Sequence, residues 1–175
     1  AHSDVVKEIR REMGVLFQGG ALFDSKSVLE NVRFPLDTLT SQTLEEKNTQ
    51  AMLCLQRVGL ENAALLMPSE ISGGMKKRVG IARAIVMNPK YLFCDEPNSG
   101  LDPLTAVKID YLIQEITQEY NMTTVVISHD MNSVMRMGES IIFLKEGKKI
   151  WDGNSKTLHH SGLPALEEFL STKLF

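Results

Sequence analysis

The chain has 175 residues, of which 43% are hydrophobic and 23% charged, with a net charge of −3 and an isoelectric point near 5.8. This length and apolar content fit one globular domain. Because the basic residues are scattered, apart from Lys76-Lys77-Arg78, the chain has no electrostatic footprint for nucleic acid, and we expect no nucleic-acid partner.

The cysteines indicate a reducing compartment, and the apolar runs are too short for a membrane span. Cys54 and Cys94 lie among apolar neighbours and not in paired spacings, which favours buried free thiols over a disulfide or a metal site. Every apolar run is far shorter than the roughly 20 residues of a membrane span. Residues 1–4 lack the apolar region of a secretory signal, so we expect a cytoplasmic location.

The first third of the chain predicts one core strand followed by helices. Residues 5–12 read as a short helix, and the apolar residues 13–17 as a strand that stops at Gln18-Gly19-Gly20. Residues 21–71 are expected to be mostly helical. They include a capping box at residues 43–46 that opens an amphipathic helix, and a short helix over residues 61–67.

The middle of the chain alternates helices with buried strands. Ser72 is a good N-cap for a helix that Pro89 ends, and residues 91–94 form an apolar strand that ends in Asp95-Glu96. Asp102-Pro103 then supplies an N-cap and a first-turn proline for the next helix.

The last strand of this pattern covers residues 123–128, a β-branched run typical of a parallel strand covered on both faces, with His129 after it. A short helix follows over residues 131–137, then a hairpin of residues 141–145 and 148–152, and a closing helix over residues 164–170. This alternation predicts a doubly wound, mainly parallel α/β sheet.

The acidic pair Asp95-Glu96 ends a predicted strand, where open α/β sheets bind ligands. Asp95 is a candidate ligand for Mg²⁺, and Glu96 a candidate to polarise the water that attacks a terminal phosphate. The alternative is that two acidic residues simply end a strand at the surface.

Other polar residues allow a phosphate site and also allow ordinary structural roles. Ser72-Gly73-Gly74 offers N–H groups at a helix start that fit a phosphate, or it is a glycine loop with a serine cap. His129 is a candidate donor to a γ-phosphate, or a structural histidine. Gln18 is a candidate contact for Mg²⁺ and water, or a polar turn residue. Asp102 caps a helix in either case.

Taken together, these segments resemble the nucleotide-binding subunit of ATP-binding-cassette (ABC) transporters over nearly the whole chain. Five motifs occur in the family's order and spacing. They are the Q-loop at Gln18, the signature Ser72-Gly73-Gly74-Met75 after Ile71, the Walker B strand that ends at Asp95-Glu96, the D-loop Ser99-Gly100-Leu101-Asp102, and the switch histidine His129.

The resemblance implies a P-loop NTPase-type core with an inserted helical subdomain. It places the core in residues 1–20 and 72–153, the helical subdomain in residues 21–71 and a C-terminal helical extension in residues 154–175. It implies ATP and Mg²⁺ as cofactors, with Glu96, His129 and Gln18 as catalytic residues and Asp95 and Gln18 at the metal. In this family the signature residues act in trans, because two subunits stack head to tail around the shared ATP.

The resemblance also implies partners and a location. A second copy of the subunit and a transmembrane permease are expected, with the chain peripheral on the cytoplasmic face of the inner membrane. A lipid-binding substrate protein and a small regulatory subunit are further candidates. Apolar and small residues within 21–34 would line the groove that receives the permease's coupling helix.

Three stretches narrow the resemblance to the ATPase of Mla-type transporters, which move phospholipid between bacterial envelope membranes. They are residues 13–24, residues 30–36 and residues 66–75, the last of which has Met75 where most cassettes place glutamine. The substrate follows only by analogy, because membrane subunits set it.

No G-x-x-x-x-G-K-[ST] phosphate loop occurs in the sequence. We expect a truncated cassette that lacks the Walker A loop and its central strand, binds ATP weakly and hydrolyses none by itself. Loss of that strand would expose apolar flanks and unpaired backbone groups, and would favour association between chains.

Two other readings stay open. One is a catalytically silent cassette that serves as an interaction module, which a missing phosphate loop in the complete sequence would favour. The other is a soluble cassette ATPase of DNA repair or translation, which predicts long coiled coils or basic extensions, and neither pattern occurs here.

Overall fold

In a computed structural model, the described residues are 2–158 and 161–173, and the chain divides into two compact units. The first unit covers residues 1–127 and the second residues 128–175. The first unit contains α1 (His2–Arg11), β1 (Met13–Leu16), α2 (Val28–Leu39), α3 (Leu44–Arg57), 3-10 turns at Glu61–Ala63 and Pro68–Glu70, α4 (Gly73–Ile85), β2 (Tyr91–Asp95), α5 (Pro103–Glu119) and β3 (Thr123–Ile127).

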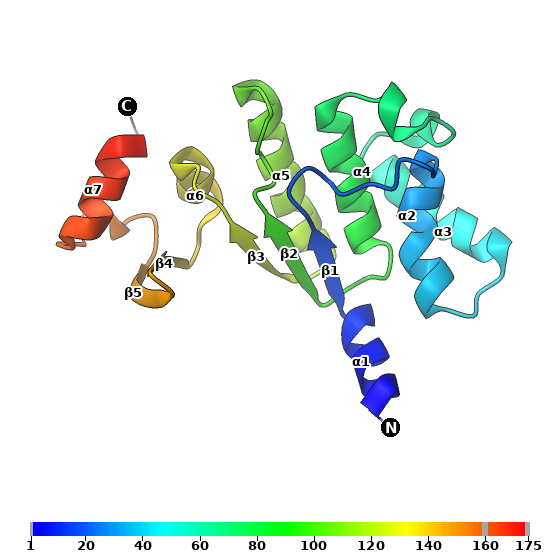
Figure 1. Ribbon diagram of the computed structural model, residues 1–175, viewed down its shortest axis with the longest axis horizontal. Helices are drawn as coiled ribbons and strands as arrows, with labels where there is room; N and C mark the ends of the chain where they lie inside the picture. The colour runs from blue at the N-terminus through cyan, green and yellow to red at the C-terminus, as the bar shows by residue number, and fades with distance from the viewer. Residues whose placement is uncertain (1, 159–160, 174–175) are drawn as a thin grey trace. The chain divides into compact units, whose positions relative to one another are not determined.

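The sheet of the first unit is parallel throughout, as the sequence predicts, with strand order β1-β2-β3 (Figure 1). The register pairs Leu16 with Cys94 in β2, and Cys94 with Val126 in β3. The connection from β1 to β2 carries α2, α3 and α4, and the connection from β2 to β3 carries α5. The carboxyl ends of the strands therefore share one edge of the sheet.

The helix predicted over residues 61–67 is wrong, because this segment is used to cap another helix. Its carbonyl groups at Ala64 and Leu66 accept hydrogen bonds of 2.9 and 2.8 Å from the N–H groups of Leu29 and Val28. The first turn of a helix leaves such N–H groups without partners. The segment therefore contains a short 3-10 turn, Glu61–Ala63, and a second turn follows it at Pro68–Glu70.

One face of the sheet is covered by α4 and α5. On this face Gly14, Leu16, Leu92 and Cys94 are buried, and the hydroxyl groups of Thr117 in α5 and Thr124 in β3 lie 2.6 Å apart.

Both thiols are free and buried, as predicted. Cys94 lies in β2 and Cys54 in α3. Burial raises the pKa of Cys94 to about 12 and that of Cys54 to about 11.

Within the described residues of the first unit, the opposite face of the sheet is open. Val125 and Ile127 in β3 are 45% and 60% exposed, and Tyr91 and Phe17 are exposed with them. The expectation that β3 is covered on both faces is therefore not met among the described residues. The physical reason is that both helices of the crossovers, α4 and α5, pack on the same side.

The second unit contains α6 (Met131–Met137), β4 (Ile141–Lys145), β5 (Lys148–Gly153) and α7 (Pro164–Lys173). The antiparallel pair β4-β5 confirms the predicted hairpin, and Glu146 and Gly147 both have the positive φ that its tight turn requires. The aromatic rings of Phe143 and Phe169 lie 5.4 Å apart in its core. Among the described residues, no helix combines the length and apolar character of a membrane span.

The close approach of α4 to β1 makes Gly14 sensitive to any side chain. A Cβ atom at Gly14 would lie 2.3 Å from the backbone oxygen of Ala84, so strand and helix would have to separate. Gly14→Ala should lower the free energy of unfolding by about 1–3 kcal/mol in urea denaturation. Val15→Ala, on the open face, is the control and should cost less than about 1 kcal/mol. Equal effects would contradict this packing.

The open face should cause the 175-residue chain to self-associate in solution. Lysine at both Val125 and Ile127 should lower the average mass measured by sedimentation at a given concentration, because charge opposes burial of the face. Lysine at the exposed residues Leu53 and Leu65, in other parts of the unit, adds the same charge and should leave association unchanged. A wild-type chain that stays monomeric at high concentration would contradict this prediction.

Candidate functional site

The signature segment forms the start of α4. The Ser72 side chain is the N-cap and accepts a hydrogen bond of 3.3 Å from the N–H of Met75. Gly73 faces Leu101, and a Cβ atom at Gly74 would lie 2.9 Å from the Cγ2 methyl group of Thr105. Glycine at position 74 therefore lets the start of α4 pack tightly against the start of α5.

The D-loop segment leads from β2 into α5 and is held by two polar contacts. Asp102 caps α5 by accepting a hydrogen bond of 3.0 Å from the N–H of Thr105, and bonding to Thr105 lowers the pKa of Asp102. The buried Asn98 donates a hydrogen bond of 2.5 Å to the buried Asp110. Between these anchors, Gly100 has a φ of +77°, which favours glycine. The segment therefore has a fixed path.

The acidic pair lies at the carboxyl end of β2, as predicted. Asp95 is exposed and Glu96 is half-buried. Glu96 has a φ of +46°, an uncommon conformation for a residue other than glycine. Its N–H donates to Ile127 O at 2.9 Å, and its carbonyl oxygen accepts hydrogen bonds from Ser99 N at 3.1 Å and Lys77 Nζ at 3.0 Å. Three hydrogen bonds thus hold the backbone of Glu96 in this conformation.

Gln18, which follows β1, contacts the D-loop, which follows the neighbouring strand β2. Its Nε2 donates a hydrogen bond of 3.3 Å to Ser99 Oγ, although the two residues are 81 positions apart in sequence. Because Ser99 N bonds Glu96 O, a continuous set of contacts joins Gln18, Ser99 and Glu96. The structure therefore brings together Q-loop, D-loop and Walker B residues within one unit.

The turn after Gln18 is clamped from α4. Arg83 is buried, and its guanidinium group donates hydrogen bonds of 2.5 Å to Gly20 O and 2.8 Å to Ala21 O. Burial lowers the pKa of Arg83. Gly20 and Ala21 both have a positive φ, so the clamp fixes a turn that the backbone would not otherwise prefer.

His129 belongs to the second unit, where it is exposed and directly precedes α6. The next residue, Asp130, caps α6 by accepting a hydrogen bond of 2.9 Å from Asn132 N. His129 therefore follows β3 closely in sequence, as predicted, and its role stays a prediction.

The acidic pair fits Mg²⁺ held jointly with a nucleotide. Among the described residues there is no group of three or more His, Cys, Asp or Glu side chains placed to hold a metal ion. Mg²⁺ is commonly bound through one or two carboxylates together with substrate phosphates and waters. Asp95 and Glu96, at the edge where the strands end, supply two carboxylates of that kind.

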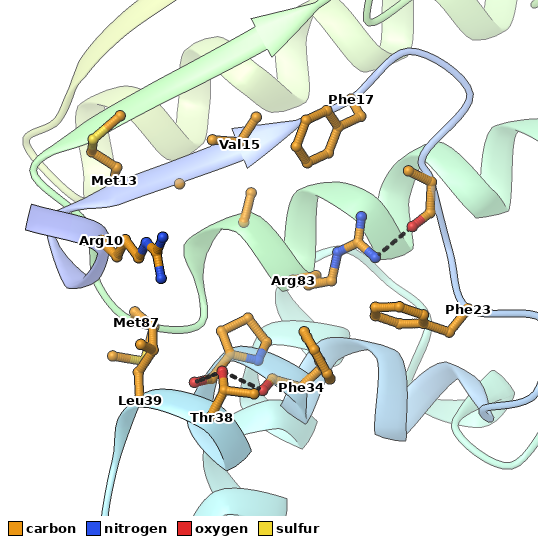
Figure 2. A pocket seen from close by; sticks show the side chains of 14 residues that line it. Arg10, Met13, Val15, Phe17, Phe23, Phe34, Thr38, Leu39, Arg83 and Met87 are labelled. Atoms are coloured by element: carbon orange, nitrogen blue, oxygen red, sulfur yellow. Dashed lines mark hydrogen bonds between the residues drawn. The ribbon is translucent and has the colours of Figure 1, made fainter. Parts of the chain in front are cut away.

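An apolar cavity of about 310 Å³ lies beside β1, between the Q-loop turn, α2 and α4 (Figure 2). Figure 2 shows Phe23 and Phe34 on one side and Phe17 on the other. The ring centroids of Phe23 and Phe34 are 4.6 Å apart. Arg83, which clamps the Q-loop turn, also lines this cavity. The cavity and the contacts of Gln18 therefore share one turn of the chain.

The sequence profile of the family described as ABC transporter matches residues 1–99. This chain belongs to the ABC transporter family. The match covers the Q-loop, the signature segment and the Walker B strand, so it includes most of the residues described above.

Relatives in this family are ATP-binding proteins of transport systems. The chain is 38% identical to the intermembrane phospholipid transport system ATP-binding protein MlaF of Haemophilus influenzae, over 93% of this chain and 62% of the relative. Its identity to MlaF of Escherichia coli K12 is also 38%, over 93% and 60%. A methionine import ATP-binding protein of Protochlamydia amoebophila is 38% identical as well, over 86% and 44%. The chain thus spans about 60% of the two MlaF sequences.

Solved structures of ATP-binding cassettes share the fold. One is a dimeric cassette in a post-hydrolysis state with ADP and phosphate, with a TM-score of 0.77 and 34% identity over 89% of this chain and 68% of the other. Another is cbiO1 of Clostridium perfringens, part of a cbiONQ transporter complex, with a TM-score of 0.80 and 29% identity over 96% and 70%. The P-loop NTPase-type fold expected from the sequence is confirmed.

Sequence reasoning missed the two buried cations of α4. Lys77 contacts the backbone of Glu96 and Arg83 that of Gly20 and Ala21, and neither has a carboxylate partner close in sequence. The available signal was weak: both lie within a helix whose apolar positions continue on either side of them. Only the three-dimensional path of the backbone shows what they bind.

The cap at Ser72 can be separated from any role in binding phosphate. Ser72→Ala should lower stability by about 1 kcal/mol in thermal or urea unfolding, because an N–H of the first turn loses its acceptor. Ser72→Asp keeps an acceptor and should restore stability, yet its negative charge should abolish ATP hydrolysis by the complete protein. Full activity of the Ser72→Asp variant would show that Ser72 serves only as a cap.

Proposed function

We propose that this chain is the catalytic part of an ABC transporter ATPase subunit that hydrolyses ATP to drive a membrane permease. The observation that carries the proposal is the set of contacts joining Gln18, Ser99 and Glu96 at the edge where the parallel strands end. In this proposal Glu96 and His129 act on the attacking water and the γ-phosphate, and Gln18 and Asp95 contact Mg²⁺.

The proposed site is shared between two copies. Ser72, Gly73, Gly74 and Met75 would bind the ATP held by the partner copy. Support comes from the exposure of Ser72 and Gly73 at the start of α4, where a helix N-terminus favours phosphate. The D-loop residues Ser99, Gly100, Leu101 and Asp102 would lie at the same junction. The phosphates would be held by a glycine-rich loop that is not among these 175 residues.

We propose phospholipid or another lipid as the transported substrate. Support comes from the MlaF relatives and from residues 13–24, 30–36 and 66–75, which resemble Mla-type ATPases. The methionine import ATP-binding protein shows equal identity over a somewhat shorter stretch. Overall sequence identity therefore does not distinguish lipid from other transported substrates. The argument rests instead on residues 13–24 and 30–36, which border the cavity beside β1. In this proposal that surface would face the membrane subunit, which differs between transport systems.

The cavity beside β1 is proposed as the docking site of a permease helix. Its lining by Phe23, Phe34 and Val15 suits the apolar side of a helix from a membrane subunit. This partner would hold the ATPase at the cytoplasmic face of the inner membrane. A lipid-binding protein and a small regulatory subunit would complete the assembly.

Glu96→Gln tests the catalytic assignment. The complete protein that contains this chain should hydrolyse ATP, and Glu96→Gln should reduce the rate by on the order of a hundredfold or more while ATP binding persists. Glu139→Gln, at an acidic residue in the second unit outside the proposed site, is the matched control. The 175-residue chain alone should show no hydrolysis. Rapid turnover by this chain, lost on Glu96→Gln, would contradict the need for a separate phosphate loop.

A silent interaction module would give a different result. In that case the complete protein would not hydrolyse ATP, and Glu96→Gln would change nothing that is measured. Binding of a membrane subunit would still be lost when Phe34 in the cavity is replaced by Asp. The two proposals therefore differ in hydrolysis and agree in docking.

A further inference from the structure

Lys77 carries a buried amino group that the proposed function does not yet use. It lies one turn into α4 and is only 3% exposed. Its neighbours in sequence, Lys76 and Arg78, are half-exposed. Lysine is almost never fully buried unless its charge has a partner, so the surroundings of Lys77 must supply a hydrogen-bond acceptor or an opposite charge.

The partner of the Lys77 amino group is the backbone of Glu96, the proposed catalytic residue. Lys77 Nζ donates a hydrogen bond of 3.0 Å to the carbonyl oxygen of Glu96. That oxygen also accepts the hydrogen bond from Ser99 N, and the N–H of Glu96 is bound to Ile127 O. Lys77 therefore completes a set of contacts around a single peptide segment.

The conformation at Glu96 explains why such contacts are needed. A φ of +46° is unfavourable for glutamate, and it persists only where the surroundings hold it. Without the amino group of Lys77, the carbonyl oxygen of Glu96 would lose a hydrogen bond that helps to hold this conformation. The direction of the Glu96 side chain depends on this backbone conformation.

The local charges agree with this geometry. Burial lowers the pKa of Lys77, whereas the negative charges of Glu96 and Asp95 raise it. The ammonium group thus sits in a site that disfavours its charge and near carboxylates that favour it. The hydrogen bond to the carbonyl oxygen of Glu96 gives a structural reason for this position.

We propose that Lys77 is a positioning residue for Glu96: its amino group, anchored in α4, fixes the peptide from which the catalytic carboxylate projects. The inference rests on the proposed catalytic function of Glu96. It adds a direct link from the helix that begins at the signature segment to the acidic residue of the same chain. Through Ser99 the link continues to Gln18.

This link has a consequence for a shared site. Ser72, at the start of α4, would contact the ATP of one site, whereas Glu96 would act in the other. Lys77 lies on the same rigid helix as Ser72, so a shift of α4 changes the support of Glu96. The signature segment and the catalytic carboxylate are then coupled mechanically by one side chain.

The experiment compares Lys77→Met with Lys76→Met in the complete protein. Methionine is close to lysine in length and suits a buried site, but it cannot donate a hydrogen bond. Lys76→Met removes the same charge from a half-exposed neighbour. For each variant, kcat and KM for ATP are measured, together with hydrogen exchange of the amides in residues 96–101.

Lys77→Met should lower kcat by on the order of tenfold to a hundredfold with KM for ATP nearly unchanged, because a misplaced catalytic group affects the chemical step. Its amides at Glu96 and Ser99 should exchange faster. Lys76→Met should match wild type in both measurements. Lys77→Gln, which keeps a donor on a shorter side chain, should recover part of kcat and serves as a second variant if Lys77→Met folds poorly.

The inference is overturned if Lys77→Met keeps the wild-type kcat, or if exchange at Glu96 and Ser99 is the same in both methionine variants. A protein that never hydrolyses ATP would instead contradict the proposed function. In that case hydrogen exchange alone still decides whether Lys77 holds the backbone of Glu96, so the two failures are distinguishable.

Discussion

The structure of the first unit depends on the close packing of α4 against β1. Two glycines make it possible: a Cβ atom at Gly14 would meet the backbone of Ala84, and one at Gly80 would lie 2.7 Å from Leu16 Cδ1. Any larger residue would push the helix away from the strand. Since α2, α3 and α5 all pack on α4 as well, this one contact sets the positions of the other helices.

The same helix carries the side chains that connect distant parts of the site. Ser72 begins it, Lys77 reaches the backbone of Glu96, and Arg83 reaches the turn after Gln18. The distance along α4 between the two cations is fixed by helix geometry, at about 1.5 Å per residue. The cavity beside β1 and the acidic pair are therefore both in contact with side chains of this one helix.

Sequence patterns predicted the strands and the capped helices well, because their signals are local. Ser72, Asp102 and the Glu146-Gly147 turn each specify structure within a few residues, and all were confirmed. The segment near Leu66 was mispredicted because its carbonyl groups serve another helix, which no local pattern reveals. Contacts such as Gln18 to Ser99, and Lys77 to Glu96, join positions distant in sequence and were visible only in the fold.

The rates at which the two buried thiols are chemically modified would report how the first unit unfolds. A thiol reacts as thiolate, and burial holds the pKa of Cys54 near 11 and that of Cys94 near 12, so neither reacts at neutral pH while the surrounding structure is closed. Cys54 lies in α3 and Cys94 in β2, directly before the acidic pair. Modification of both at one rate would mean that helices and sheet unfold as a single cooperative unit, whereas faster modification of Cys54 would mean that α3 detaches first from a persistent sheet.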